Sequence, residues 1–505
     1  MVYVYDTTLR DGAQTPHLNL SLDGKLRITE LLHNLGVPYI EGGFVGSNPR
    51  DEAYFREVME RRRGGYLPNS KIAAFGMTAK STDVENDPYL KVLTETDADV
   101  FTIVGKSHKD QVREVLKHSP SRYLEIVRSS IDFLKSTGKE VFFDAEHFFD
   151  GYRNDPDYAM RVLEAAKHAD SIVLCDTNGG TWPDDIHDVT YQVRQEFSVP
   201  LGIHCHNDRE LAVANSMAAV KAGAEQVQAA VNGLGERAGN ANTNSLLANL
   251  KLMGYGAISD SELRHLTRIA TEVGRVTGRR VPRNMPYVGS EAFYHTGGLH
   301  ADAMVKMPGS YEHIEPEIVG NKRYFVLSEQ SGKAAVNWWI DKFRFEVTSH
   351  ELSSLMKHVN EIQNLGEAQI YLLFVKELNL AARPFEIVNG TVSDTFDGYP
   401  EATIKVRVNG NEYHEVSVGD GPVNALDLAL RKVLMKEHPA VGKLELVDYN
   451  VELPAGEHGT EARVDVSITF RYNGSEFESR ATDSDIFKAS RRAVEDGYAY
   501  YLIQQ

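Results

Sequence analysis

The chain is poor in cysteine and has no long apolar run. Only two of its 505 residues are cysteine, Cys175 and Cys205, and both lie in short apolar stretches without a Cys-x-x-Cys spacing. We therefore expect neither a disulfide framework nor a thiolate zinc site. No segment reaches the roughly 18 consecutive apolar residues that a membrane span needs. Residues 2–5 already read as a strand, without a secretory leader, so we expect a cytoplasmic protein that does not enter membranes.

Basic residues are outnumbered by acidic ones. The chain has 54 Lys and Arg against 72 Asp and Glu, which gives a formal net charge of −18. Such a surface repels phosphate backbones and anionic lipid, so no nucleic-acid partner is expected. Hydrophobic residues make up 42% and charged residues 25%, a composition typical of a globular protein. The length predicts two or three domains, one of them large.

From residue 2 to about residue 250, short β-type runs alternate with amphipathic helical stretches, a pattern typical of parallel strands with crossover helices. The strand candidates recur at regular intervals: Val2–Tyr5, Tyr39–Gly42, Lys71–Phe75, Val100–Val104, Glu140–Asp144, Ser171–Cys175, Leu201–His204 and Gln226–Val231. The helical stretches between them include Leu22–Leu35, Pro120–Ser136, Pro156–His168 and Leu211–Ala222. Eight β/α units in about 250 residues predict a TIM (β/α)8 barrel, with its chemistry at the C-terminal strand ends.

The rest of the chain predicts two further domains. Residues 258–383 read as a helical connecting subdomain interrupted by a stretch with Gly and Pro. Beyond residue 384, Asn409-Gly410 and Asn473-Gly474 each mark a hairpin between alternating strands, and a helix follows each hairpin, near Val423 and near Ile486. Residues 384–505 therefore predict an α+β domain of two β-β-β-α repeats. We expect domains at 1–257, 258–383 and 384–505, and a regulatory pocket or a dimerisation surface between the repeats.

Three predicted strand ends carry side chains that bind metals. His204 and His206 stand at i and i+2 at the end of the seventh strand, so both rings project from the same face. Asp11 follows the first strand, and a glycine-rich turn after the eighth brings Asn240 into reach. One carboxylate, two imidazoles and an amide oxygen suit Mg²⁺, Mn²⁺ or Zn²⁺. A structural Arg10–Asp11 ion pair and a mutual hydrogen bond between the histidines are the alternatives.

Together these segments resemble a known enzyme family. The motifs TLRDG at 8–12, HxHND at 204–208 and GxGERxGN at 233–240, in this order, are similar to those of the isopropylmalate, homocitrate and citramalate synthases. The resemblance covers nearly the whole chain, and the two-repeat tail is similar to the family's regulatory domain. Four further segments, 40–43, 46–49, 144–151 and 176–180, most resemble the longer type of citramalate synthase.

The resemblance implies a role for each of ten residues. The implied metal ligands are Asp11, His204, His206 and Asn240. The other residues contact substrate or take part in catalysis: Arg10 nearest the keto oxygen, Gln14 and Thr177 as substrate contacts, Glu146 as the catalytic carboxylate, and His300 with Tyr311 as catalytic residues of the connecting subdomain. These last two are expected to serve the barrel of the partner subunit, which implies a homodimer.

The implied reaction is a divalent-metal-dependent condensation of acetyl-CoA with a 2-keto acid, followed by hydrolysis that releases CoA. Pyruvate, giving citramalate, is the favoured keto acid. The general base that removes the acetyl proton is Glu146 or His300. CoA is anionic and needs a local basic patch, for which Lys106, Lys109 and the run Arg61–Arg63 are candidates. An amino acid, isoleucine or leucine, is the effector expected at the tail.

Four alternatives stay open. Residues 15–20, Thr-Pro-His-Leu-Asn-Leu, depart from the Glu-Gly-Ile-Ser-like run of the longer citramalate synthases, so an isopropylmalate-, homocitrate- or other alkylmalate-type synthase is possible. A hydroxymethylglutaryl-CoA lyase or a related aldolase is a second alternative, although residues 233–240 lack the cysteine typical of those lyases. A biotin-dependent carboxyltransferase fits less well, because no lysine accompanies the histidine motif. The last alternative is a non-catalytic metabolite sensor.

Overall fold

The computed structural model describes the chain except for residues 47, 257, 328–330, 360–364, 394–397 and 455–461. The described residues form two compact units. Residues 1–293 and 314–323 make the first unit, and residues 294–313 and 324–505 make the second. The predicted domain boundaries after residues 257 and 383 do not coincide with this division and stay predictions.

The first unit is a closed barrel of parallel strands in the order β1 to β8, with β1 paired to β8. Its strands are β1 (Tyr3–Asp6), β2 (Tyr39–Phe44), β3 (Lys71–Met77), β4 (Val100–Lys106), β5 (Glu140–Glu146), β6 (Ser171–Asp176), β7 (Leu201–Cys205) and β8 (Gln226–Ala229). Each lies at the predicted place, and β8 ends two residues early because residues 231–233 form a tight 3-10 turn. The predicted TIM barrel is confirmed.

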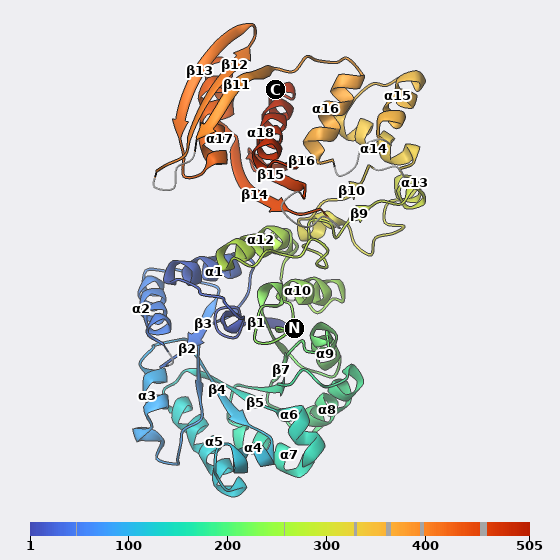
Figure 1. Cartoon of the computed structure of the whole chain (residues 1–505). Helices are drawn as coiled ribbons and strands as arrows, with labels where there is room; N and C mark the ends of the chain where they lie inside the picture. Colours follow the sequence, from blue (N-terminus) through green and yellow to red (C-terminus); the bar gives the residue numbers. More distant parts are fainter. Residues whose placement is uncertain (47, 257, 328–330, 360–364, 394–397, 455–461) are drawn as a thin grey trace. The chain divides into compact units, whose positions relative to one another are not determined.

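Helices surround these strands (Figure 1). They are α1 (Leu22–Asn34), α2 (Pro49–Arg63), α3 (Pro88–Thr94), α4 (Lys109–Glu114), α5 (Pro120–Ser136), α6 (Phe148–Asn154), α7 (Pro156–Ala166), α8 (Pro183–Glu196), α9 (Ala212–Lys221), α10 (Thr243–Leu252), α11 (Asp260–Leu263) and α12 (Leu266–Thr277). Helix α5 illustrates the sequence logic. Its buried residues Tyr123, Ile126, Val127, Ile131 and Leu134 recur every three or four positions and form the face that joins the core.

The second unit begins with short elements that surround a small aromatic core. They are β9 (Tyr294–His295), α13 (Gly298–Lys306), β10 (Tyr324–Phe325), α14 (Lys333–Phe343), α15 (Ser349–Val359) and α16 (Glu367–Glu377). Trp339 is fully buried and donates its indole N–H to the backbone oxygen of Phe325 at 2.8 Å. Helix α16 also packs on the tail, because Gln369 donates to the Ser479 hydroxyl at 2.8 Å. Contacts of this kind join the connecting helices and the tail into one unit.

The tail repeats one motif twice. Strands β11 (Phe385–Ser393), β12 (Glu401–Val408) and β13 (Asn411–Val418) form an antiparallel sheet followed by α17 (Pro422–Glu437). Strands β14 (Glu445–Glu452), β15 (Val464–Tyr472) and β16 (Ser475–Asp483) form a second sheet followed by α18 (Ile486–Ile503). Both copies carry a register shift early in their first strand, between residues 387 and 389 and between 446 and 448. The two predicted β-β-β-α repeats are confirmed.

The predicted hairpins of the tail have the backbone that their residues favour. Asn409 and Gly410 have φ values of 49° and 83°, and Asn473 and Gly474 have 49° and 81°. Positive φ at both central residues defines the tight turn that matches the twist of paired strands, and Asn-Gly adopts it at little cost. Within the described part of the chain, no helix is both long enough and apolar enough to span a membrane.

Candidate metal centre at the C-terminal strand ends

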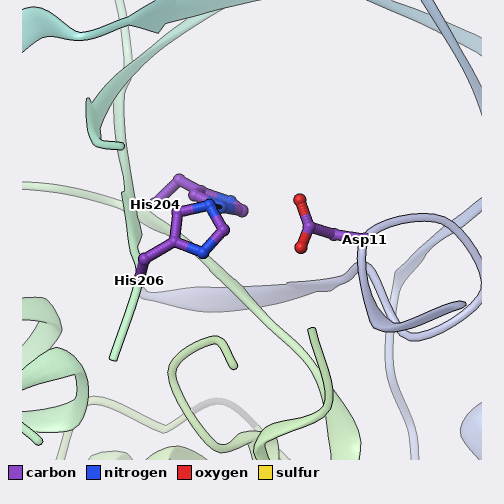
Figure 2. A group of neighbouring side chains, drawn as sticks. All are labelled: Asp11, His204 and His206. Atoms are coloured by element: carbon purple, nitrogen blue, oxygen red, sulfur yellow. Dashed lines mark hydrogen bonds between the residues drawn. The ribbon is translucent and has the colours of Figure 1, made fainter. Parts of the chain in front are cut away.

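Three buried side chains on or just after the first and seventh strands converge at the barrel mouth. Asp11 follows β1, His204 lies on β7 and His206 directly follows β7. Their solvent-exposed fractions are 5%, 5% and 6%. One potential ligand atom from each lies within 4.8 Å of the others. Figure 2 shows the Asp11 carboxylate directed toward the two imidazole rings. The fold therefore unites three of the four predicted ligands.

The two histidines present their ring nitrogens to one another. The Nε2 atoms of His204 and His206 are 3.4 Å apart. Burial lowers the pKa of His204 to about 3 and also lowers the pKa of His206. Both rings are therefore neutral near pH 7, the state in which an imidazole nitrogen binds a metal ion.

Asn240 completes the set in a way that fits a cation. Its amide nitrogen donates to Asp11 Oδ1 at 2.8 Å and to the backbone oxygen of Leu234 at 3.0 Å. Its amide oxygen is buried and has no hydrogen-bond partner among the described residues. A buried acceptor without a partner is costly unless a ligand satisfies it. A carboxylate, two neutral imidazoles and a free amide oxygen fit a divalent cation.

Arg10 connects this cluster to a second buried carboxylate. Its Nε donates to Glu41 Oε2 at 2.6 Å, and its Nη1 donates to Asp11 Oδ2 at 2.7 Å. The guanidinium also lies 4.0 Å from the centre of the Phe75 ring. Burial acts to raise the pKa of Asp11, but Arg10 and the two histidines outweigh it and hold that pKa well below its usual range. Asp11 therefore stays ionised and available to a cation.

Glu146 and Thr177 lie at the ends of neighbouring strands β5 and β6. Lys106 ends β4 in register with Glu146, and its ammonium group lies 2.6 Å from Glu146 Oε2. The backbone N–H of His147 donates to the Thr177 hydroxyl at 2.7 Å. His147 has a φ of 58°, a left-handed backbone at a sharp turn. The turn thus fixes the predicted catalytic carboxylate and the predicted substrate contact relative to one another.

Arg237 joins three of the loops around the site. Its Nε and Nη2 donate to the two carboxylate oxygens of Asp208, both at 2.9 Å, and Nη2 also donates to the backbone oxygen of Thr177 at 2.8 Å. These loops follow β6, β7 and β8. Asp208 belongs to the HxHND motif and Arg237 to the GxGERxGN motif, but neither has a role assigned from the sequence, and only the fold shows that they pair.

Gln14 lines a hollow of the same barrel that Arg10 also lines. It is exposed in the 3-10 turn Gly12–Gln14 and lines a cavity of about 600 Å³ together with Arg10, Leu18 and Phe44. The divergent segment after Gln14 is anchored to the eighth loop, because the Gly235 N–H donates to the Thr15 hydroxyl at 2.9 Å. Arg10 lines this cavity and also pairs with Asp11. Arg10 therefore connects the cavity that contains Gln14 to the metal centre.

His300 and Tyr311 lie in the second unit, apart from the other predicted site residues along the chain. Their rings stack with centroids 4.1 Å apart, and both side chains are largely exposed. A buried pair, His295 and Glu312, anchors the same segment through a 2.9 Å hydrogen bond. The structure therefore pairs these two residues with each other on an exposed surface.

The basic candidates for a CoA patch all have acidic partners. Lys106 binds Glu146, and Lys109 binds Asp155 at 2.6 Å. In the run at the end of α2, each arginine pairs with a carboxylate: Arg61 with Glu57, Arg62 with Asp99 and Arg63 with Asp97.

The two cysteines, Cys175 and Cys205, are buried and form no disulfide.

Two buried groups close to the metal centre escaped sequence reasoning. Gln228, which is 1% exposed, contacts His204, and Asp144, which is 3% exposed, contacts Gln228. Burial raises the pKa of Asp144 to about 8. A signal for Gln228 existed in the sequence, because Gln226 and Gln228 place polar side chains at i and i+2 in a strand that is otherwise apolar.

The fold and the site define a TIM-barrel enzyme with a candidate metal centre. Residues 1–273 match the HMGL-like family model, residues 287–367 the homocitrate synthase post-HMGL domain-like model, and residues 364–502 the LeuA allosteric (dimerisation) domain model. The chain belongs to the HMGL-like family and, within it, to the isopropylmalate, homocitrate and citramalate synthases. The predicted resemblance is confirmed.

Relatives match this chain from end to end. The (R)-citramalate synthase of Aquifex aeolicus strain VF5 is 40% identical over 521 residues, covering 100% of this chain and 98% of that protein. The (R)-citramalate synthase of Geobacter sulfurreducens is 40% identical over 520 residues, covering 99% and 98%. Among solved structures, the HMG-CoA lyase of Bacillus subtilis is 19% identical, with a TM-score of 0.47, and covers 56% of this chain and 95% of that one.

Proposed function

We propose that this protein condenses acetyl-CoA with pyruvate and hydrolyses the resulting thioester to give citramalate and CoA. The observation that carries the proposal is the buried cluster of Asp11, His204, His206 and the free oxygen of Asn240. It lies in a chain that is 40% identical, over its whole length, to proteins named (R)-citramalate synthase.

Those four residues hold the divalent cation, Mg²⁺, Mn²⁺ or Zn²⁺, in our proposal. A bound cation supplies Lewis acidity, which polarises the keto carbonyl and stabilises negative charge on its oxygen. The protein prepares the ligands for this task, because Arg10 keeps Asp11 ionised and burial keeps both imidazoles neutral. The amide nitrogen of Asn240 donates to Asp11 and to the backbone oxygen of Leu234. These two hydrogen bonds fix the orientation of the amide and leave its oxygen available to the cation.

Arg10 orients the keto acid. Glu41 and Asp11 hold two of its N–H donors, which fixes the direction of the guanidinium plane. Its charge then stabilises the alkoxide that develops on the keto oxygen as the new carbon–carbon bond forms, an effect commonly worth several kcal/mol. Thr177 and Gln14 are proposed contacts to the keto acid. Each lies on a loop after a barrel strand.

Glu146 or His300 removes a proton from the acetyl methyl group. The carbon acid is weak, so the base must act as the enolate forms. The Lys106 ammonium group lies 2.6 Å from Glu146 Oε2 and holds this carboxylate in place at the end of β5. His300, with Tyr311 stacked on it, is proposed to serve the barrel of a second copy in a homodimer. Water then hydrolyses the thioester, and CoA departs with the sulfur.

Release of CoA from acetyl-CoA tests the reaction. The purified protein is given Mg²⁺ or Mn²⁺ and, separately, pyruvate, 2-oxoisovalerate, 2-oxoglutarate or oxaloacetate, with an EDTA control. Turnover with pyruvate that EDTA abolishes is the expected result. Turnover with another keto acid instead would replace citramalate by a different alkylmalate. Cleavage of a hydroxyacyl-CoA without any condensation would favour the lyase.

A mixture of two inactive variants tests the shared site. Asp11→Asn lacks a proposed metal ligand, and His300→Asn lacks the proposed partner residue. If His300 serves the neighbouring barrel, the mixed dimer contains one complete site and regains up to about half of the activity per mixed dimer. No recovery on mixing would place His300 at the barrel of its own chain.

The tail is proposed to bind an apolar amino acid as an effector. A cavity of about 700 Å³ lies between the repeats and is lined by Leu428, Leu446, Tyr449, Phe487 and other residues. Such a volume accepts a small ligand. Isoleucine or leucine should raise the melting temperature and reduce turnover, with glycine as the control. If neither amino acid changes stability or activity, and removal of residues 384–505 only alters assembly, the tail serves dimerisation alone.

A further inference from the structure

A continuous chain of hydrogen bonds leads away from the candidate metal centre. His204 on β7 and Gln228 on β8 are paired residues of neighbouring parallel strands. His204 Nδ1 lies 2.8 Å from Gln228 Oε1, and Gln228 Nε2 donates to Asp144 Oδ1 on β5 at 2.9 Å. The exposed fractions of Gln228 and Asp144 are 1% and 3%, so water does not compete for these bonds.

The orientation of the Gln228 amide decides where His204 carries its proton. Because the amide nitrogen faces the Asp144 carboxyl group, the amide oxygen faces His204. An amide oxygen can only accept, so Nδ1 of His204 must be the protonated nitrogen. A neutral imidazole has one N–H, which leaves Nε2 with its lone pair. That nitrogen is the one that faces the partner histidine at 3.4 Å.

We propose that Gln228 is a positioning residue of the metal centre: it accepts the Nδ1 proton of His204 and thereby directs the Nε2 lone pair of that ring at the cation. The inference rests on the proposed metal site but not on the proposed reaction. Its physical basis is general, because the hydrogen bond to the far nitrogen fixes both the tautomer and the rotation of a metal-bound imidazole.

The same strand supplies a matched control. Gln226 precedes Gln228 by two residues, so it lies on the same face of β8, and it is fully buried. Its amide oxygen accepts from the Ser171 hydroxyl at 2.8 Å, and within the described part of the chain Gln226 makes no hydrogen bond to a proposed ligand. Methionine has a side chain of similar shape to glutamine but no amide, so replacing either glutamine by methionine removes one buried amide. Only the change at Gln228 removes a bond to His204.

Calorimetric titration with Mn²⁺ tests the inference on full-length, metal-free protein. Gln228→Met should weaken Mn²⁺ binding about 10- to 100-fold, the usual effect of losing such a supporting bond. Gln226→Met should bind Mn²⁺ as the unchanged protein does. Gln228→Glu keeps an acceptor for the Nδ1 proton and should bind at least as tightly as the unchanged protein. The absorption bands of bound Co²⁺ should change in Gln228→Met alone.

Each contrary outcome has a distinct meaning. Equal weakening in Gln228→Met and Gln226→Met, with equally lowered melting temperatures, would show a general packing effect and overturn the inference. Unchanged Mn²⁺ affinity and Co²⁺ spectrum in Gln228→Met would also overturn it, and the proposed function would stand. If the unchanged protein bound neither metal, the inference and the metal-dependent reaction would both fall. Metal binding as expected, but no CoA release with any keto acid, would remove the proposed reaction alone.

Discussion

The Nε2 atoms of His204 and His206 lie 3.4 Å apart inside the barrel mouth. Burial keeps both rings neutral, and the Gln228 oxygen holds the His204 proton on the opposite side of that ring. Two imidazole nitrogens directed at one point, with an ionised carboxylate within 4.8 Å, are arranged for a cation. The alternative, two histidines that only form a hydrogen bond with each other, does not require an ionised carboxylate beside them.

The first prediction concerns metal and stability. Mn²⁺ should raise the melting temperature of the protein, because a ligand at about 100 times its Kd stabilises the folded state by about 2.7 kcal/mol. His206→Ala should abolish that rise. His168→Ala is the control, because His168 is an exposed histidine that pairs with Asp132. An equal Mn²⁺ response in all three proteins would place the cation elsewhere.

The second prediction concerns the proposed base. Glu146→Gln should lower turnover about 10²- to 10⁴-fold with little change in KM for pyruvate, because a general base acts in the transition state. Glu140 begins the same strand and also pairs with a lysine, Lys71. Glu140→Gln should therefore retain normal turnover. Near-normal rates in both Glu146→Gln and His300→Asn would remove both candidates for the base.

The third prediction concerns the loop contact of Arg237. Arg237→Ala frees Asp208 and the backbone oxygen of Thr177, and with them three loops at the barrel mouth. We expect kcat/KM to fall about 10-fold, since small displacements of substrate contacts are costly. The melting temperature should hardly change, because partly exposed ion pairs contribute about 0–1 kcal/mol. Arg275→Ala, which breaks a helical surface pair with Glu272, should change neither quantity.

The fourth prediction concerns pH. In the folded protein, burial raises the pKa of Asp144 to about 8, from its ordinary value of 3.8. The folded protein therefore holds a proton that the unfolded chain releases between these values, so stability is complete below about pH 4 and falls as the pH rises toward 8. Asp144→Asn cannot titrate and avoids this loss.

Urea unfolding of the metal-free proteins at several pH values measures the difference. Relative to the unchanged protein, Asp144→Asn should gain on the order of a few kcal/mol in free energy of unfolding between pH 4 and pH 8. The variant keeps an oxygen that can accept from Gln228. Parallel stability curves for the two proteins would show that Asp144 ionises normally in the fold.

The fifth prediction concerns packing in the tail. Gly497 lies on α18, and a Cβ atom there would stand 2.1 Å from Cε2 of Phe470 on β15. Gly497→Ala should lower the free energy of unfolding by about 1–3 kcal/mol despite the better helix propensity of alanine. Gly421→Ala is the control, because its Cβ would meet no atom within 4 Å. Thermal unfolding that ranks the two variants equally would contradict this packing.

Local signals in the sequence were sufficient for most of the fold. Alternating apolar runs and helical stretches place all eight barrel strands, because strands buried on both faces leave long apolar signatures. The Asn-Gly pairs place both tail hairpins, because Asn and Gly adopt positive φ easily and the turn needs only these two residues. The division of the chain into compact units was not predicted, because it depends on contacts such as Gln369 with Ser479 across 110 positions.

The sequence by itself determined which residue types stand at the strand ends: Asp11, the histidines of the HxH motif and Asn240. Only the tertiary structure decided whether these side chains are charged or neutral and which hydrogen bonds orient them. Asp11 and Asn240 are 229 positions apart and share a 2.8 Å hydrogen bond, while Gln228 and Asp144 are 84 positions apart and share one of 2.9 Å. Burial and hydrogen-bond direction depend on such distant neighbours, and no local spacing encodes them.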